Sequence, residues 1–418
     1  MKILWLVNIV MPELAVHLGE KPSVAGGWLT GALQAARSAG HGLTVCTTRE
    51  NAQRVRFCPD LSTTYLLLPP DADFAAILEA EQPDVVHIWG TEFAQAWALA
   101  RVSDPARTLV SVQGLVHTFG PHVRAGIPEH ICRTTRLHRL YERLGKNIQS
   151  IDRQRDSFAR RAETERLVLQ RAGHVNGGTA WADNCVRLLQ PGVRLHPCGL
   201  ILRSSFYRES EWSADNCRPH SIFTLYTYPI KGFHKLLEAL VPVVARYPDT
   251  RVYVAGNKCA YRNLTGLKRK LMDLAPDYDW YVQSLIERYG LRDNLVFLGY
   301  LSEEQMRSQL LQSQVFVSAS SIENHSTLLG EAMITGVPSI ASCVGGLQDM
   351  IDHGQDGFLY PFEETYTLAA HILRLFEDRA LAEQFSRQGH IHAARTYNRE
   401  QNRLDLLAMY DKIGGAGK

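Results

Sequence analysis

The sequence predicts an α/β protein built from two βα domains, and three observations support this. The chain has 418 residues, which is too long for one ordinary core and suits two domains of roughly 200 residues each. Short, nearly continuous apolar segments alternate with helical segments, as in parallel sheets covered on both faces. This alternation stops after residue 118 and restarts at residue 221, so the pattern occurs twice.

The amino-terminal half contains five short apolar runs that we interpret as strands. They lie at residues 3–10, 43–47, 65–68, 85–89 and 109–112. Helices are expected to begin at Gly27, Asp73 and Phe93. The apolar start of the chain could be mistaken for a signal peptide, but Asn8 and Pro12 interrupt it and no small-residue cleavage site follows. A first buried strand fits it better.

A long helical stretch is expected at residues 129–172, and it is rich in arginine. Between Arg124 and Arg171 there are twelve Lys and Arg residues against six acids. Two interpretations stand side by side. The excess could rest on anionic lipid near a lipid-linked acceptor, as a peripheral membrane contact. Alternatively, the stretch is a solvated face of paired charges, which the interspersed acids favour.

The carboxyl-terminal half repeats the alternation with further short apolar strands. They are expected at residues 221–226, 251–255, 294–298, 315–318, 339–341 and 358–360. Helices are expected at 235–247, 267–289 with an interruption near Pro276, 302–312, 326–335, 364–388 and 396–413. Ser302 with Gln305 forms a capping box for one of them. We therefore expect an amino-terminal domain at 1–200, a second domain at 201–395, and a carboxyl-terminal helix at 396–418.

Composition restricts the function classes. Hydrophobic residues make up 45% of the chain and charged residues 21%, as in globular proteins, and no run reaches the ~18 apolar residues of a membrane span. The formal net charge of +2 gives no case for a nucleic-acid partner. Eight scattered cysteines without a C-x-x-C pair indicate reduced thiols and a cytoplasmic protein.

The most informative segment runs from the strand at 315–318 into the helix at 326–335. Glu323 lies in the loop at the strand's carboxyl end, and Glu331 lies about two turns inside the helix. The loop presents free backbone N–H groups at a helix N-terminus, which can bind an anion. Two carboxylates beside an anion site suit a ligand that carries both hydroxyls and phosphate, such as a nucleotide sugar. The alternative is a pair of solvated acids on an ordinary strand–loop–helix unit.

Two other loops at strand ends also suit the phosphate groups of such a ligand. Gly26 and Gly27 follow the first strand, where two glycines let the backbone approach a diphosphate closely. Lys231 and Gly232 follow the strand at 221–226, and a cation there can offset the charge that develops on a leaving phosphate. Taken alone, each is equally compatible with a turn or a surface lysine.

Together, these elements resemble the retaining family-4 glycosyltransferases of the GT-B fold. The resemblance rests on Lys231-Gly232, on Glu323-x7-Glu331 some 90 residues later, and on the glycines of Gly336-Val-Pro338 and Val344-Gly-Gly346. The amino half, through His87-Ile-Trp-Gly-Thr-Glu92, looks like a bacterial subgroup assigned to exopolysaccharide and surface-glycan biosynthesis. The resemblance implies two Rossmann-like domains facing across a cleft, with the carboxyl-terminal helix crossing back to the amino-terminal domain.

The resemblance also implies roles for individual residues. Glu323 would bind donor-sugar hydroxyls, Glu331 the ribose hydroxyls, and Lys231 the donor diphosphate, over which Gly26 and Gly27 would close. Further donor contacts would come from Asn324, His325 and Ser326, and from Tyr300 and Leu301 beside the nucleobase. The implied reaction moves a sugar from a UDP- or GDP-sugar to a carbohydrate, lipid-linked or small-molecule acceptor, at the inner face of the membrane where the acceptor is lipid-linked.

The sequence departs from the family pattern at two positions. The family places an Arg five or six residues before the Lys, where Leu225 and Tyr226 stand here. Its active-site His is replaced by Gln113, whose neutral amide can orient a group but cannot act as a base. His87 and His117 are possible nearby substitutes. Gln113 is therefore a catalytic candidate as an orienting residue, beside Glu323 and Lys231.

The resemblance implies front-face transfer, in which the departing diphosphate takes the acceptor proton and no metal is required. Asp71 and Asp73, like Asp277 and Asp279, have the D-x-D form of metal-dependent transferases, but they fit a helix N-terminal turn and a Pro-flanked loop. Two alternatives stay open: a nucleotide-sugar epimerase or hydrolase on the same fold, and a non-catalytic nucleotide-sugar-binding protein.

Overall fold

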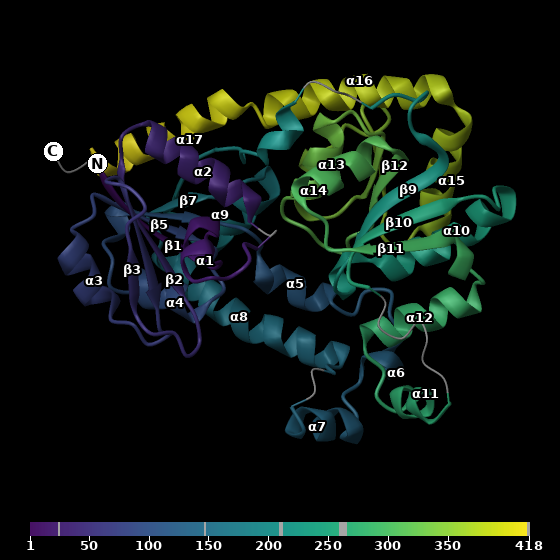
Figure 1. The fold of residues 1–418 in the computed structure, drawn as a ribbon, viewed down its shortest axis with the longest axis horizontal. Helices are drawn as coiled ribbons and strands as arrows, with labels where there is room; N and C mark the ends of the chain where they lie inside the picture. The colour runs from purple at the N-terminus through teal and green to yellow at the C-terminus, as the bar shows by residue number, and fades with distance from the viewer. Residues whose placement is uncertain (24–25, 146–147, 209–211, 259–265, 416–418) are drawn as a thin grey trace. The chain divides into compact units, whose positions relative to one another are not determined.

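The computed structural model describes the chain apart from residues 24–25, 146–147, 209–211, 259–265 and 416–418 (Figure 1). One basic residue of the arginine-rich stretch, Lys146, and one of the eight cysteines, Cys259, therefore lie outside the described residues. The chain forms two compact units, each with its own sheet. Unit 1 comprises residues 1–117, 160–204 and 395–418, and unit 2 comprises residues 118–159 and 205–394.

The sheet of unit 1 has the strand order β3-β4-β2-β1-β5-β6-β7-β8, and its pairs are parallel except for β3 with β4. Its strands are β1 (Lys2–Val7), β2 (Gly42–Thr48), β3 (Val55–Phe57), β4 (Thr63–Leu68), β5 (Val85–Trp89), β6 (Thr108–Ser111), β7 (His174–Asn176) and β8 (Arg194–Leu195). β1 and β5 are almost entirely buried, as expected for strands covered on both faces.

The strands that sequence analysis missed are short and lie toward the edges of this sheet. β3 and β7 have three residues and β8 has two. A run of two or three residues gives only a weak apolar pattern. The partners of β7 and β8 also lie 20 or more residues away along the chain, so the folded sheet defines these strands.

The helices of unit 1 are α1 (Pro12–His17), α2 (Gly27–Ser38), α3 (Phe74–Glu81), α4 (Ala94–Ala100), α9 (Ala180–Leu189) and α17 (Arg399–Gly414). Three of them begin at a side-chain cap, which is Asp73 for α3, Thr179 for α9 and Asn398 for α17. The carboxyl-terminal helix α17 packs on α2 and β5, and its Leu406, Met409 and Tyr410 belong to the buried core around Trp5. This confirms the expectation that the last helix returns to the amino-terminal fold.

The sheet of unit 2 has the order β11-β10-β9-β12-β13-β14, and all of these pairs are parallel. Its strands are β9 (Arg218–Tyr226), β10 (Arg251–Gly256), β11 (Leu295–Gly299), β12 (Ser313–Ser318), β13 (Ser339–Ser342) and β14 (Phe358–Tyr360). Each strand matches a run expected from sequence. The order reverses direction between β9 and β12, where ligands of such sheets bind at the strands' carboxyl ends.

Helices cover both faces of this second sheet. They are α10 (Phe233–Arg246), α11 (Gly266–Asp273), α12 (Tyr278–Arg288), α13 (Glu303–Leu311), α14 (Thr327–Ile334), α15 (Thr365–Glu377) and α16 (Arg379–Thr396). α10 contacts both α12 and α15 on one face, and α13 and α14 lie on the other side of β12 in Figure 1. The break between α11 and α12 occurs at Pro276, as expected.

Residues 118–159 group with unit 2, although they lie within the range expected for the amino-terminal domain. They include α6 (Glu129–Cys132), α7 (Arg136–Arg143) and parts of α5 (Val116–His122) and α8 (Ile151–Arg171). Hydrogen bonds from His234 Nε2 to Ala125 O and from Ser321 Oγ to His122 O hold this segment to the second sheet's helices and loops. The helical stretch expected at 129–172 consists of three helices, α6, α7 and α8.

Candidate functional site

A buried ion pair joins two loops at the carboxyl edge of the second sheet. Lys231 follows β9, Glu323 follows β12, and Lys231 Nζ lies 2.5 Å from Glu323 Oε2. The two side chains are only 18% and 12% exposed. Burial alone would lower the pKa of Lys231, but the carboxylate of Glu323 outweighs burial and raises it. The lysine is therefore charged at neutral pH and is held in place by the acid.

Two glycines let these loops approach closely enough to form the pair. Gly232 has a φ of +65°, and a Cβ there would lie 1.7 Å from the carbonyl oxygen of Ala319. Gly345, in the loop after β13, has a φ of +50°, and its Cβ would lie 2.1 Å from the carbonyl oxygen of Glu323. Gly346 N also donates to that oxygen at 3.0 Å. Three loops at one sheet edge are thus fixed around the backbone of Glu323.

Helix α14 begins beside this pair and carries the second acid. Ser326 caps the helix by accepting a hydrogen bond from Leu329 N, and it lines a cavity of about 20 Å³ together with Lys231. Glu331 is 3% exposed inside the helix. Asn324 is buried, and burial lowers the pKa of His325 to about 4, so its imidazole is neutral. The loop therefore places amide groups and a helix N-terminus next to one charged lysine.

The structure explains how the two residues at the expected arginine position are used. Leu225 lines the same small cavity as Lys231, so the side chain that faces the site is apolar. Tyr226 points the other way, as expected for neighbours on a strand, and its hydroxyl donates to Asp279. Among the described residues that line this cavity, Lys231 is the only cation.

The segment expected beside the nucleobase lies at the end of β11. Tyr300 is 70% exposed, and its hydroxyl donates to Asn257 Oδ1 at 2.9 Å, while Leu301 follows it. Gly299 has a φ of +76°, and a Cβ there would lie 2.6 Å from Lys258 Cε. Sequence analysis missed Asn257 and Lys258. They directly follow the strand β10, so the rule that found the other loops could have found them.

The glycine loop of unit 1 needs its glycines for backbone conformation and space. Gly26 has a φ of +75° and caps α2, and a Cβ there would lie 2.2 Å from Ile9 Cδ1. A Cβ on Gly27 would lie 2.5 Å from Arg203 Cγ. Ala25, which precedes them, lies outside the described residues. The phosphate role expected for Gly26 and Gly27 stays a prediction.

Gln113 lies at the carboxyl end of β6 in unit 1. Its Oε1 accepts a hydrogen bond from Asn8 Nδ2 at 2.9 Å, which fixes the orientation of the amide. Its Nε2 is buried without a hydrogen-bond partner among the described residues. Asn8 therefore orients the side chain of Gln113, and the amide nitrogen of Gln113 can still donate hydrogen bonds.

Of the two histidines considered as substitutes, His87 does not qualify. It is fully buried, its Nδ1 lies 2.8 Å from Tyr410 Oη, and its Nε2 lies 2.8 Å from Ser111 Oγ. Burial also lowers its pKa well below the usual value. His117 is 15% exposed, and both its Nδ1, at 2.6 Å, and its backbone N–H, at 2.9 Å, bond to Glu165 Oε1.

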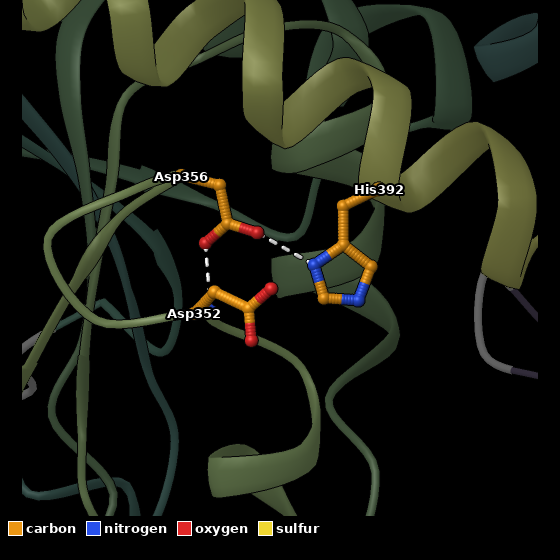
Figure 2. A group of neighbouring side chains, drawn as sticks. All are labelled: Asp352, Asp356 and His392. Carbon is orange, nitrogen blue, oxygen red and sulfur yellow. Dashed lines mark hydrogen bonds and ion pairs between the residues drawn. The ribbon is translucent and has the colours of Figure 1, made fainter.

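Three of the four D-x-D carboxylates cap a helix or accept a hydrogen bond. Asp73 caps α3, Asp277 caps α12 and Asp279 accepts from Tyr226. Among the described residues, one group of three side chains is close enough to hold a metal ion: Asp352, Asp356 and His392 (Figure 2). There, Asp356 accepts hydrogen bonds from Asp352 N at 2.8 Å and from His392 Nδ1 at 2.6 Å. These bonds satisfy both oxygens of the buried carboxylate and join the loop after residue 350 to α16.

Comparison with known proteins identifies the family of the second unit. Residues 222–392 match the family described as glycosyl transferases group 1. This stretch is a group 1 glycosyltransferase domain. The domain contains Lys231, Glu323 and Glu331, so the resemblance noted in the sequence is confirmed.

Individual relatives support the same family. The D-inositol 3-phosphate glycosyltransferase of Corynebacterium urealyticum is 27% identical over 186 residues, which are 44% of this chain and 41% of that enzyme. The chain spans about half the length of the curated relatives it matches.

Solved structures with low sequence identity show the fold of the whole chain. Sucrose-phosphate synthase from Thermosynechococcus elongatus has a TM-score of 0.67 and 18% identity, with 100% of both chains covered. HepE of Anabaena, in complex with UDP-glucose, has a TM-score of 0.63 and 16% identity, with 98% of this chain and 99% of that chain covered. The expected GT-B fold with two Rossmann-like domains is therefore confirmed.

Proposed function

We propose that the protein transfers a sugar from a nucleotide-sugar donor to a hydroxyl group of a carbohydrate, lipid-linked or small-molecule acceptor, with retention of the anomeric configuration. The observation that supports this most directly is the buried pair of Lys231 and Glu323 beside the N-terminus of α14, within a group 1 glycosyltransferase domain. A lysine fixed by an acid next to free amides suits a diphosphate that gains charge as it departs.

In the proposed reaction, the bond between the sugar's C1 and the diphosphate oxygen breaks while the acceptor oxygen bonds to C1 on the same face. The departing diphosphate oxygen takes the acceptor's proton, so no protein base is required. Lys231 and the amides of α14 stabilise the diphosphate, and the diphosphate replaces Glu323 as the lysine's partner. Glu323 then accepts hydrogen bonds from the donor sugar's hydroxyls.

The remaining residues would bind the nucleotide and orient the acceptor. Glu331 accepts from the ribose hydroxyls, and the exposed ring of Tyr300 stacks on the base. Gln113, whose Oε1 accepts from Asn8, donates to an acceptor or donor hydroxyl from its amide nitrogen. We propose a UDP-sugar as the first donor to test, because solved structures with this fold contain UDP or UDP-glucose. We further propose a cytoplasmic, metal-independent enzyme, whose activity should survive a chelator.

The test compares Glu331→Ala with Glu304→Ala, which removes an exposed acid on the neighbouring helix α13. Loss of hydrogen bonds to a charged group costs about 1.5–3 kcal/mol, so Glu331→Ala should weaken donor binding roughly 10- to 100-fold. Donor binding is followed by the rise in melting temperature with UDP and GDP. Glu304→Ala should bind like the wild type.

Product analysis separates the proposed reaction from the alternatives. NMR of the product should show the donor's anomeric configuration in the new linkage. Epimerised donor formed without acceptor would indicate an isomerase. Tight donor binding without turnover of any donor would indicate a non-catalytic binding protein, and unchanged turnover by Glu331→Ala would refute the site.

A further inference from the structure

We infer that α7 is a docking helix that rests on an anionic lipid surface. Its docking surface consists of Arg136, Arg139, Leu140, Arg143 and Leu144, which we call the α7 surface. All five side chains are exposed, and Leu140 and Leu144 are 49% and 61% exposed. The inference is independent of the proposed transferase reaction, because it uses none of the donor-site residues.

One face of α7 anchors the helix to unit 2. His138 is 1% exposed, and its Nε2 lies 3.2 Å from the carbonyl oxygen of Pro276, between α11 and α12. Thr135 and His138 form a capping box at the helix start. These contacts fix which side of α7 faces the rest of unit 2, and the opposite side faces away from it.

The opposite face combines arginine with leucine. Successive residues of an α-helix are rotated by about 100°, so Arg136, Leu140 and Arg143 lie on the side away from His138. Arg139 flanks them, and Leu144 follows at the C-cap. Leu274, two residues from the anchoring Pro276, is a further exposed leucine at 63%. On such a mixed face, the long arginine side chains can keep their guanidinium groups at lipid headgroups while the leucines contact the acyl boundary.

The pairing of charges decides between the two interpretations of the arginine-rich stretch. Each of its six acids has a defined basic partner: Glu129 with Arg133, Glu142 with Arg153, Asp152 with Arg124, Asp156 with Arg155, Glu163 with Arg166, and Glu165 with His117. The paired-charge interpretation thus describes α8 well. Arg136, Arg139 and Arg143 have no acidic partner among the described residues, so the positive excess is concentrated on α7.

The leucines favour a lipid surface over another polyanion. A nucleic acid or an acidic polysaccharide would bind the arginines but would leave Leu140 and Leu144 in water. An anionic bilayer satisfies both, since arginines gain from the negative surface potential and leucines from the acyl boundary. No helix among the described residues is long and apolar enough to cross a membrane, so the contact we propose is peripheral.

Flotation of the full-length protein with vesicles tests this inference. The wild type should bind phosphatidylcholine vesicles that contain phosphatidylglycerol, should not bind pure phosphatidylcholine, and should dissociate at high salt. Each arginine near an anionic surface contributes about a five-fold gain in partitioning. The triple variant R136Q/R139Q/R143Q should therefore lose roughly 100-fold.

A matched control removes the same charge elsewhere. Arg54, Arg288 and Arg387 are exposed arginines on other elements, and R54Q/R288Q/R387Q should bind vesicles nearly as the wild type does. L140S/L144S keeps every charge and should still reduce binding clearly. Thermal melting of each variant confirms that it is folded, and Glu331→Ala should float like the wild type even if it no longer binds donor.

Three outcomes would overturn the inference. These are absence of binding to anionic vesicles, equal losses in the two triple variants, and unchanged binding of L140S/L144S. Unchanged binding of L140S/L144S would show that the α7 surface acts through charge alone. In that case an excess of a soluble polyanion would displace the protein from the vesicles.

Discussion

At the scale of single residues, the candidate site depends on an acid and a lysine that satisfy one another without a ligand. Glu323 is the partner of Lys231, and Gly232 and Gly345 provide the space that brings their loops together. A buried charge without its partner is costly, so the pair contributes to stability as well as to the proposed chemistry.

The first prediction concerns this pair. Glu323→Ala should lower the free energy of unfolding by about 2–4 kcal/mol, because it leaves the ammonium of Lys231 mostly buried and unpaired. Urea denaturation at neutral pH measures the change. The double variant Lys231→Met/Glu323→Ala should recover part of this loss while donor binding stays impaired.

A double variant that is less stable than Glu323→Ala alone would contradict this account. It would mean that the aliphatic chain of Lys231, and not its unpaired charge, dominates the energetics of the site. Ser320→Ala is a mild control, since Ser320 Oγ contacts the same carboxylate at 3.2 Å but carries no charge.

At the scale of elements, local capping signals override long periodic patterns. The expected helix at 129–172 is divided because Thr135 caps α7 and Gly145, with a φ of +69°, follows its end. The expected helix at 364–388 is similarly divided at Asp378, which accepts from Leu381 N at the start of α16. Polar caps inside a periodic run were thus the informative signal in both cases.

The second prediction concerns the contact between α16 and the loop before β14 (Figure 2). Asp356→Ala should destabilise the protein by about 1–3 kcal/mol, because Asp352 N and His392 Nδ1 both lose their acceptor. Chemical denaturation provides the measurement. Asp352→Ala is the matched control, since only its backbone N–H takes part, and it should change stability by less than about 0.5 kcal/mol.

Equal losses in Asp356→Ala and Asp352→Ala would show that the two carboxylates act together, as they would around a cation. A stability gain on adding divalent metal to the wild type would point the same way.

At the scale of the whole molecule, the chain crosses between its two units and returns. Residues 395–418 belong to unit 1, and α17 reaches its core through Tyr410. The phenol accepts from Trp5 Nε1 at 3.1 Å and lies 2.8 Å from His87 Nδ1. The end of the chain is therefore part of the first unit's buried polar network.

The third prediction tests this network. Tyr410→Phe should lower the free energy of unfolding by about 1–3 kcal/mol, because it leaves Trp5 Nε1 and His87 Nδ1 buried without their partner. The loss should appear in thermal or urea denaturation followed by tryptophan fluorescence. Tyr366→Phe, at a position that is 82% exposed, should leave stability unchanged. An equally small effect of Tyr410→Phe would contradict the role of the Tyr410 hydrogen bonds in stability.

The sequence by itself determined the strands of both sheets except β3, β7 and β8, and it located Lys231 and Glu323 at strand ends. Apolar periodicity is a local signal, and the carboxyl ends of parallel strands meet at one edge of the sheet. Both can therefore be inferred from a single sequence. The domain limits at 200 and 395 and the residues' roles in catalysis stay predictions.

Only the tertiary structure decided that Lys231 pairs with Glu323, that Leu225 and not Tyr226 faces the site, and that residues 118–159 pack with the second sheet. It also showed that the arginines of α7 have no acidic partner among the residues the structure describes. These features depend on side-chain direction and on contacts between residues far apart in sequence. No local pattern encodes such contacts, because they form only when the chain closes around its cores.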